Sequence, residues 1–374
     1  MRNTEKKFLQ TQTVKCYYLH EDIMVSKEEA KNALDKVIEK SRVHLYKPIQ
    51  IAEILYHARM DESLNLLDLE QYRTKSKKWR DEISLPLLGR ICTSSAKFQD
   101  NLFEENAVPP RILNALGQEN NKTKGAVEAY IYQRFTTKLS QLSNALEYCR
   151  KTDRTNFYVG KFIDIFWNEP GLKRSLDKIY EIIVYALFST IVETLDFRIT
   201  LSVDSGKINI LKEFEDFARK IMCVDCKKTE FVQDAKIYRV GVTNAADRGL
   251  DMYSNWGPAI QIKHLSLNPE LAENIVTGIS SDKIVIVCKD AEKNIIVSLL
   301  SQIGWRNRIQ SIVTENDLID WYEKALRGKY SELMSDKLLN ILNDEIAEEF
   351  PSTAKMPESL QVRHYELIKN DFWK

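Results

Sequence analysis

Two patterns of apolar residues follow one another along the chain, and the change between them lies near residue 200. From about residue 26 to 200, apolar residues mostly recur at intervals of three and four, which is the spacing of one face of an α-helix. Beyond residue 200, short apolar runs with strand character alternate with helical segments. We therefore expect a mainly helical first part and a mixed α/β second part.

The helical pattern begins at a recognisable capping sequence. Ser26 is followed three residues later by Glu29, which is the spacing of an N-cap serine and a capping-box glutamate. The clearest helices that the spacing predicts are Glu28–Ser41, Pro48–Ala58, Ala126–Cys149 and Leu172–Glu193.

The second part opens with a predicted helix, Ile210–Met222, whose apolar residues lie on one stripe that should pack against another element. A three-strand meander follows, and then a helix, a buried strand, a helix, a strand and a helix. This order predicts an α/β fold in which a mixed sheet is flanked by helices. The predicted segments after the first helix are Lys236–Thr243, Gly249–Trp256, Ala259–Leu267, Pro269–Gly278, Lys283–Cys288, Asn294–Ile303, Arg308–Val313 and Glu315–Leu326.

The length of the chain favours more than one hydrophobic core. The chain has 374 residues, whereas single cores tend to stop growing near about 250–300 residues. We expect a large, mainly helical N-terminal domain over residues 1–200, an α/β domain over 201–330 and a helical C-terminal extension over 331–374.

Charge, cysteine usage and hydropathy narrow the class of protein. Lys plus Arg and Asp plus Glu both number 54, so the net charge gives no support to a nucleic-acid partner. Evidence for such a partner must come from local patches of basic residues. The six cysteines are scattered and the polar start has no apolar leader, so we expect a reduced, cytoplasmic protein. The apolar stretches are too short to span a membrane. The sequence contains no Walker-type glycine loop, so we predict no requirement for ATP.

One short constellation carries chemistry. Gln261 and Lys263 are two residues apart on a predicted strand, so their side chains project from the same face. Asp251 lies on the preceding strand, across the turn Asn255–Pro258, within reach of both. Oxygen ligands gathered in this way are what a hard metal ion prefers.

Such a site suits the hydrolysis of a phosphodiester by a bound Mg²⁺ ion. Asp251 is expected to be the principal anionic ligand, and the Gln261 side-chain carbonyl and the Ile262 main-chain carbonyl complete the protein's share of the shell. Lys263 is expected to orient the attacking water and to counter the developing negative charge.

The pattern resembles the PD-(D/E)xK nuclease superfamily, in which an Asp and a turn precede an acidic or amide residue, one apolar residue and a Lys. The Q-x-K form is similar to the Mrr-like branch, where a Phe-Glu pair on the preceding helix and a Gly-apolar-Asp segment recur. Here these are Phe214–Glu215 and Gly249–Asp251. The resemblance covers roughly residues 210–290 and implies a restriction-endonuclease-like core.

The amide at position 261 leaves this site one negative charge short of the usual pattern. We therefore expect a fourth catalytic residue and metal ligand, Glu215, at the border of the apolar stripe of its helix. Glu213, at the other border of that stripe, is the alternative.

Three longer segments, Ser41–Glu53, Thr93–Asp100 and Asp247–Leu265, resemble HaeII-type type II restriction endonucleases. This resemblance covers most of the chain and implies cleavage of unmethylated, palindromic double-stranded DNA with a GCGC core, alongside a cognate DNA methyltransferase. A palindrome presents two equivalent half-sites, so we also expect a homodimer.

Two stretches of the helical half are candidates for contacts with DNA. The run Arg73–Arg80 holds five cations and no acid, which suits phosphate contacts, although such a run is more often a solvated helix face. A second stretch carries Arg and Gln side chains of the kind that read base edges. The candidate DNA-binding residues are Lys75, Lys77, Lys78, Arg80, Arg90, Lys97 and Gln99.

Other hypotheses stay open at this point. A modification-dependent, Mrr-like or repair endonuclease would share the same core, and a DNA-binding module with an inactive site would explain the amide at Gln261. Cys223 and Cys226 have the spacing of half a zinc site, but structural thiols are favoured because no second pair follows. His264 should point away from Lys263 and pack or lie on the surface.

Overall fold

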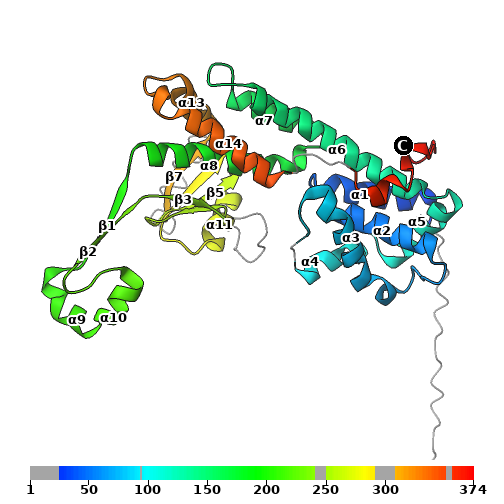
Figure 1. Ribbon diagram of the computed structural model, residues 1–374, viewed down its shortest axis with the longest axis horizontal. Coiled ribbons are helices and arrows are strands. Elements are labelled where there is room, and N and C mark those ends of the chain that lie inside the picture. Colours follow the sequence, from blue (N-terminus) through cyan, green and yellow to red (C-terminus); the bar gives the residue numbers. More distant parts are fainter. Residues whose placement is uncertain (1–24, 93–94, 241–249, 291–307, 351–355) are drawn as a thin grey trace, which may run out of the picture.

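The computed structural model describes residues 25–92, 95–240, 250–290, 308–350 and 356–374, which form two packed bodies and a projecting arm (Figure 1). One body is helical, and the other contains a five-stranded sheet. The described part of the chain has no helix that is both long and apolar enough to cross a bilayer.

The sheet has the strand order β3-β4-β5-β6-β7. The first three strands form the predicted antiparallel meander, whereas β5, β6 and β7 run parallel. The mixed α/β sheet is therefore confirmed, with strands shorter than predicted. The strands are β3 (Ile237–Arg239), β4 (Met252–Ser254), β5 (Ala259–Lys263), β6 (Ile284–Cys288) and β7 (Ile309–Thr314), and the helices that follow β5 and β7 are α11 (Pro269–Gly278) and α13 (Glu315–Arg327).

Three predicted elements fall partly or wholly outside the described residues. The last residues of the strand Lys236–Thr243 and the first residue of the strand Gly249–Trp256 lie there, and so does the whole helix Asn294–Ile303.

Helices cover both faces of the sheet. Ile260 and Ile262 point into the core that the sheet shares with α8 (Leu176–Thr194), α13 and α14 (Ser335–Glu349). Ala259 points to the other face, where it packs with residues of α11. Strand β6 is buried along its whole length, as its unbroken apolar sequence predicts.

The helical body contains the predicted helices Glu28–Ser41 and Pro48–Ala58 and the first part of Ala126–Cys149, whereas Leu172–Glu193 packs with the sheet. Its first helix starts at the predicted cap, where the Ser26 hydroxyl accepts a hydrogen bond from the backbone N–H of Glu29 at 3.0 Å. The Glu29 side chain instead contacts Arg111. The helices are α1 (Lys27–Lys40), α2 (Tyr46–Met60), α3 (Arg73–Leu88), α4 (Ala96–Asp100), α5 (Pro110–Lys122) and the long α6 (Ala126–Lys151).

The buried residues divide between the two bodies within α6, rather than near residue 200. Phe135 belongs to the core of the helical body and Leu142 to the core around the sheet. Consequently α7 (Val159–Asn168) and α8 pack with the sheet. Periodicity identifies a helix and its apolar face, but it does not identify the element which that face covers.

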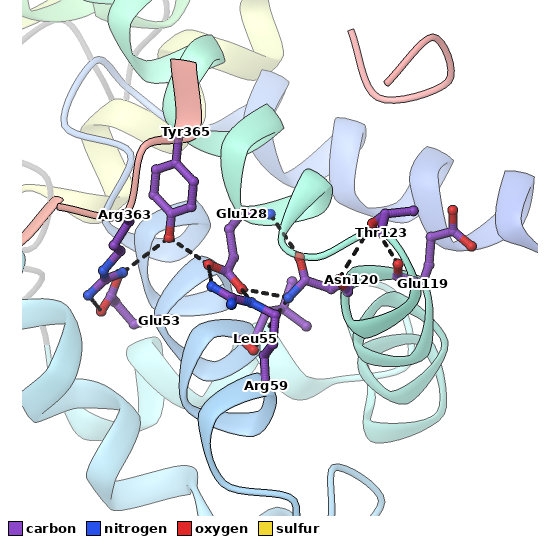
Figure 2. A network of polar contacts seen from close by, with 9 residues as sticks. All are labelled: Glu53, Leu55, Arg59, Glu119, Asn120, Thr123, Glu128, Arg363 and Tyr365. Carbon is purple, nitrogen blue, oxygen red and sulfur yellow. Dashed lines mark hydrogen bonds and ion pairs between the residues drawn. The ribbon is translucent and has the colours of Figure 1, made fainter. Parts of the chain in front are cut away.

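The C-terminal residues also divide between the bodies. Helix α14 packs against α8, whereas Tyr365 and Trp373 are buried in the helical body. The last segment is anchored by a network of buried charges (Figure 2). Arg363 donates two hydrogen bonds to Glu53 of α2, at 2.7 and 3.0 Å, and the Tyr365 hydroxyl donates one to Glu128 of α6 at 2.6 Å.

Candidate active site

The β4–β5 hairpin brings Asp251 beside Gln261. Met252 at the start of β4 pairs with Ile260, so Asp251, which directly precedes β4, lies opposite Gln261 of β5. The Asp251 Oδ2 atom accepts a hydrogen bond from the Gln261 amide Nε2, and a second from the backbone N–H of Ile262 at 2.7 Å. Gly257, at a φ of +123°, provides the backbone conformation that the tight turn between the strands requires.

Gln261 has a buried oxygen that has no hydrogen-bond partner. Its side chain is only 2% exposed, and its Nε2 atom is occupied by Asp251. The other end of the amide, Oε1, is buried and accepts no hydrogen bond within the described parts of the chain. A buried polar atom of this kind is costly unless a ligand satisfies it.

Lys263 ends β5 and is partly exposed. Strand alternation places it on the same side as Gln261. Burial raises the pKa of the Asp251 carboxyl, and the hydrogen bond from Ile262 and the charge of Lys263 oppose that rise. The structure therefore brings Asp251, Gln261 and Lys263 together.

Glu215 does not join them. It lies in the short helix α10 (Glu215–Phe217) at the tip of the arm, which stands apart from the sheet (Figure 1). Its Oε1 atom accepts a hydrogen bond from the backbone N–H of Cys226 at 3.1 Å. Glu213 is at the end of helix α9 (Ile208–Glu213), on the same tip. The predicted helix Ile210–Met222, which was expected to bring Glu215 to the site, belongs to the arm instead.

Two carboxylates of α8, Glu181 and Asp177, lie near enough to Asp251 for their charges to interact with it, and Glu181 is the more buried of the two. Burial raises the pKa of Glu181 to about 7, Lys178 lowers it, and the nearby charge of Asp251 raises it further. Lys178 donates hydrogen bonds to both Glu181 oxygens, at 2.6 and 2.7 Å. Sequence reasoning missed this residue, although its place within the apolar segment Ile179–Leu187 was a usable signal, because acids are rarely buried there without a partner.

Several of the candidate DNA-binding residues are instead engaged in contacts within the helical body. The Arg80 side chain is buried and donates hydrogen bonds to Asp81, Gln50 and Gln99. Lys77 pairs with Asp100 at 2.6 Å. The buried positions of α3 recur along one stripe, and Arg80 lies on that stripe. Only part of the basic run Arg73–Arg80 is therefore exposed to solvent.

Arg90 is also engaged in an internal contact. Its guanidinium donates to the main-chain oxygen of Glu349 at the end of α14 and contacts the ring of His44. It thereby joins the helical body to the sheet body. The remaining candidates, Lys75, Lys78 and Lys97, are exposed.

A further group of cations gathers around Trp167, close to the candidate site. The Lys289 ammonium lies 3.9 Å from the centre of the Trp167 ring, and that of Lys173 lies 4.8 Å from it. Burial lowers the pKa of His264, the charge of Asp177 opposes this, and the charges of Lys263, Lys289 and Arg174 lower the pKa further. These cations therefore lie near one another, and we call Trp167, Lys173, Arg174 and Lys289 the basic rim.

The donor set at this site fits a hard, oxygen-seeking cation. Within the described ranges, no group of three or more His, Cys, Asp and Glu residues is placed to hold a metal. Mg²⁺ does not require one, because it is usually held by one or two carboxylates and keeps several waters. Asp251 and Glu181 are two such carboxylates, and the unpartnered Oε1 of Gln261 is a third oxygen.

Comparison with known proteins identifies the family. The chain matches the HaeII restriction endonuclease family over residues 30–365. It is 58% identical to the type II restriction enzyme HaeII of Haemophilus aegyptius, over 89% of this chain and 93% of that protein. It is 56% identical to the type II restriction enzyme NgoBI of Neisseria gonorrhoeae, over 93% of this chain and 99% of that protein.

No solved structure gives a significant match to the chain. The family match and the two relatives confirm the predicted class, that of a type II restriction endonuclease. The chain belongs to the HaeII restriction endonuclease family.

Proposed function

We propose that this enzyme hydrolyses DNA phosphodiesters with Mg²⁺ at the site formed by Asp251, Gln261, Lys263 and Glu181. The observation that carries the proposal is the buried Oε1 of Gln261, which has no partner in the described residues and belongs to the amide that Asp251 holds. Its target is an unmethylated palindrome, and the resemblance to HaeII-type enzymes suggests a GCGC core.

Asp251, the Gln261 side chain, the Ile262 main-chain carbonyl and Glu181 would hold the metal. When bound there, Mg²⁺ supplies charge neutralisation at the scissile phosphate and lowers the pKa of a coordinated water. This assignment replaces Glu215 by Glu181 as the additional carboxylate, because burial and the charge of Asp251 act on Glu181 while Glu215 is bonded within the arm.

The protein groups prepare the site before DNA arrives. The bonds from Gln261 and Ile262 fix the orientation of the Asp251 carboxylate on the hairpin. Lys178 fixes that of Glu181. Lys263, at the end of β5, is positioned to hold the attacking water and to counter negative charge that develops on the phosphate.

The basic rim extends this site along the DNA backbone. Trp167 holds two ammonium groups beside one ring, and like charges brought together in this way favour an anionic ligand. Lys173 and Lys289 therefore contact phosphates next to the one that is cut. Lys75, Lys78 and Lys97 are exposed and remain proposed phosphate contacts of the helical body.

The enzyme acts as a homodimer, because a palindrome offers two equivalent half-sites and each strand must be cut. A cognate DNA methyltransferase protects the same site in the cell. This functional partner follows from the proposed target, because an unprotected genome would be cut.

The proposed activity can be tested with matched DNA substrates. Purified enzyme, Mg²⁺ and unmodified phage DNA should give discrete fragments, and cytosine methylation at the mapped site should prevent cutting. Cleavage of only the methylated substrate would instead favour the modification-dependent alternative. A uniform smear, or no cleavage across salts and divalent metals, would contradict the proposal.

A further inference from the structure

The arm contributes no residue to the proposed active site. Strands β1 (Arg198–Ser202) and β2 (Glu230–Asp234) pair antiparallel over their whole length. They carry a tip made of α9, α10 and a π-helical turn, Ala218–Met222. Figure 1 shows that this arm leaves the end of α8 and stands clear of both bodies.

The tip exposes the apolar stripe that the sequence predicts to be packed. Ile210, Phe214, Phe217 and Ile221 are 56, 54, 55 and 68% exposed. Only a small group of residues is buried beneath them, namely Leu211, Ala218 and Val224. The stripe therefore faces outward, with no cover from the described parts of its own chain.

We infer that a second copy of this chain covers the exposed stripe, arm against arm. This deepens the proposed function by assigning the homodimer a surface. Contact between the same surface on two copies gives an interface with twofold symmetry, which closes at the dimer. It thereby fits an enzyme that meets two equivalent half-sites.

The apolar area on the arm is sufficient for such a contact. Further exposed apolar side chains of the arm are Met222 and, on one face of the strands, Phe197 and Leu201, each of which is about half exposed. Together with the stripe they present on the order of 700 Å² per copy, if each offers about half of its full area. An interface of standard size buries about 800 Å² per partner, with a spread of about 200 Å² to either side.

The charge of the arm favours a copy of itself over DNA as the occupant. Between residues 198 and 234 the basic and acidic residues are equal in number, so the arm has no net charge and two arms do not repel one another. A surface that binds the DNA backbone would carry an excess of cations. The basic residues are Arg198, Lys207, Lys212, Arg219, Lys220, Lys227 and Lys228, and the acidic residues are Asp204, Glu213, Glu215, Asp216, Asp225, Glu230 and Asp234.

The test is the molar mass in solution without DNA, measured by light scattering over a range of micromolar concentrations. The wild type should have twice the mass of the 43.5 kDa chain. The double variant Phe217→Asp/Ile221→Asp should raise the dimer dissociation constant at least about 30-fold, because it places charge at the centre of the interface. Circular dichroism should show an unchanged fold.

The matched control is Leu333→Asp/Val362→Asp, which changes two side chains that are 67 and 65% exposed away from the arm. It should keep the wild-type dissociation constant. Hydrogen exchange of the wild type provides a second measurement that needs no variant, and protection of residues 208–222 should increase with protein concentration.

A monomeric wild type would overturn the inference, as would a double variant that dimerises like the wild type, or protection of residues 208–222 that arises only on adding DNA. Failure to cleave by a protein that dimerises through the arm would contradict the proposed function alone.

Discussion

Lys263→Ala should slow cleavage on the order of 10²–10³-fold while leaving DNA binding intact. The lysine is proposed to hold the attacking water and to counter charge that develops during the reaction, and it ends β5 beside the Asp251 carboxylate. Loss of such a group lowers the rate on the order of 10²–10³-fold. Single-turnover cleavage and fluorescence anisotropy, both with a duplex that the wild type cuts, would measure the two effects separately.

A matched control and a contrasting variant test whether the effect of Lys263→Ala is specific to catalysis. Lys151→Ala removes a lysine that is 72% exposed and pairs only with Glu147 on the surface of α6, so it should cut at the wild-type rate. Lys173→Ala/Lys289→Ala should show the opposite pattern to Lys263→Ala. It should weaken binding and reduce the slope of log affinity against log salt by about 2, because two phosphate contacts are lost.

Lys263 would be excluded as a catalytic residue if the variant cut within a few-fold of the wild-type rate. If the wild type itself bound DNA without cutting, the chain would be a binding module with an inactive site, despite its relatives. Parallel losses of binding and cleavage would make Lys263 a DNA contact only.

Arg363→Ala should destabilise the helical body by about 3–5 kcal/mol, which is the cost of leaving a buried charge without its partner. Arg363 and Glu53 are 8 and 2% exposed and form a bidentate pair between the C-terminal segment and α2 (Figure 2). Thermal unfolding followed by circular dichroism should show a Tm lower by on the order of 10 °C.

Two further variants separate the effect of the unpaired buried charge on stability from a general loss of packing. Adding Glu53→Gln to Arg363→Ala should recover part of the stability, because it removes the unpaired buried charge. Arg111→Ala breaks a pair that is half-exposed on the surface, and it should change stability by less than about 1 kcal/mol. A Tm for Arg363→Ala equal to that of Arg111→Ala would mean that the network does not anchor the C-terminus.

The parts of the fold that depend on local pattern were predictable from the sequence. The hairpin with Asp251 on one strand and Gln261 on the next follows from strand alternation and the Asn255–Pro258 turn. Strand β6 follows from its unbroken apolar run, and the long helices follow from their spacing.

The parts that depend on packing between distant segments were not predictable in this way. The apolar stripe of Ile210–Met222 predicted one continuous helix packed against another element, but the segment is broken into short helical turns on the arm and its stripe is exposed. Strands β1 and β2 are largely exposed on both faces, so they lack the alternation that identifies a half-buried strand.

The proposed replacement of Glu215 by Glu181 has the same origin. Glu181 precedes Asp251 by seventy residues, and it lies near Asp251 because α8 packs against β5. Nothing in the spacing of the two residues along the chain indicates that they are close. The basic run Arg73–Arg80 is only partly exposed for a related reason, because Arg80 lies on the buried stripe of α3.

The single-turnover cleavage rate as a function of Mg²⁺ concentration tests whether Asp251 and Glu181 hold the metal on which cleavage is proposed to depend. Wild type should require Mg²⁺ and stop in excess chelator. Asp251→Asn should lose cleavage on the order of 10³-fold or more at all Mg²⁺ concentrations. Glu181→Gln should need about tenfold more Mg²⁺ for the half-maximal rate, whereas Glu215→Gln should match the wild type. Cleavage that persists in chelator, or an Asp251→Asn variant that cuts as fast as the wild type, would show that cleavage does not depend on a metal held by Asp251.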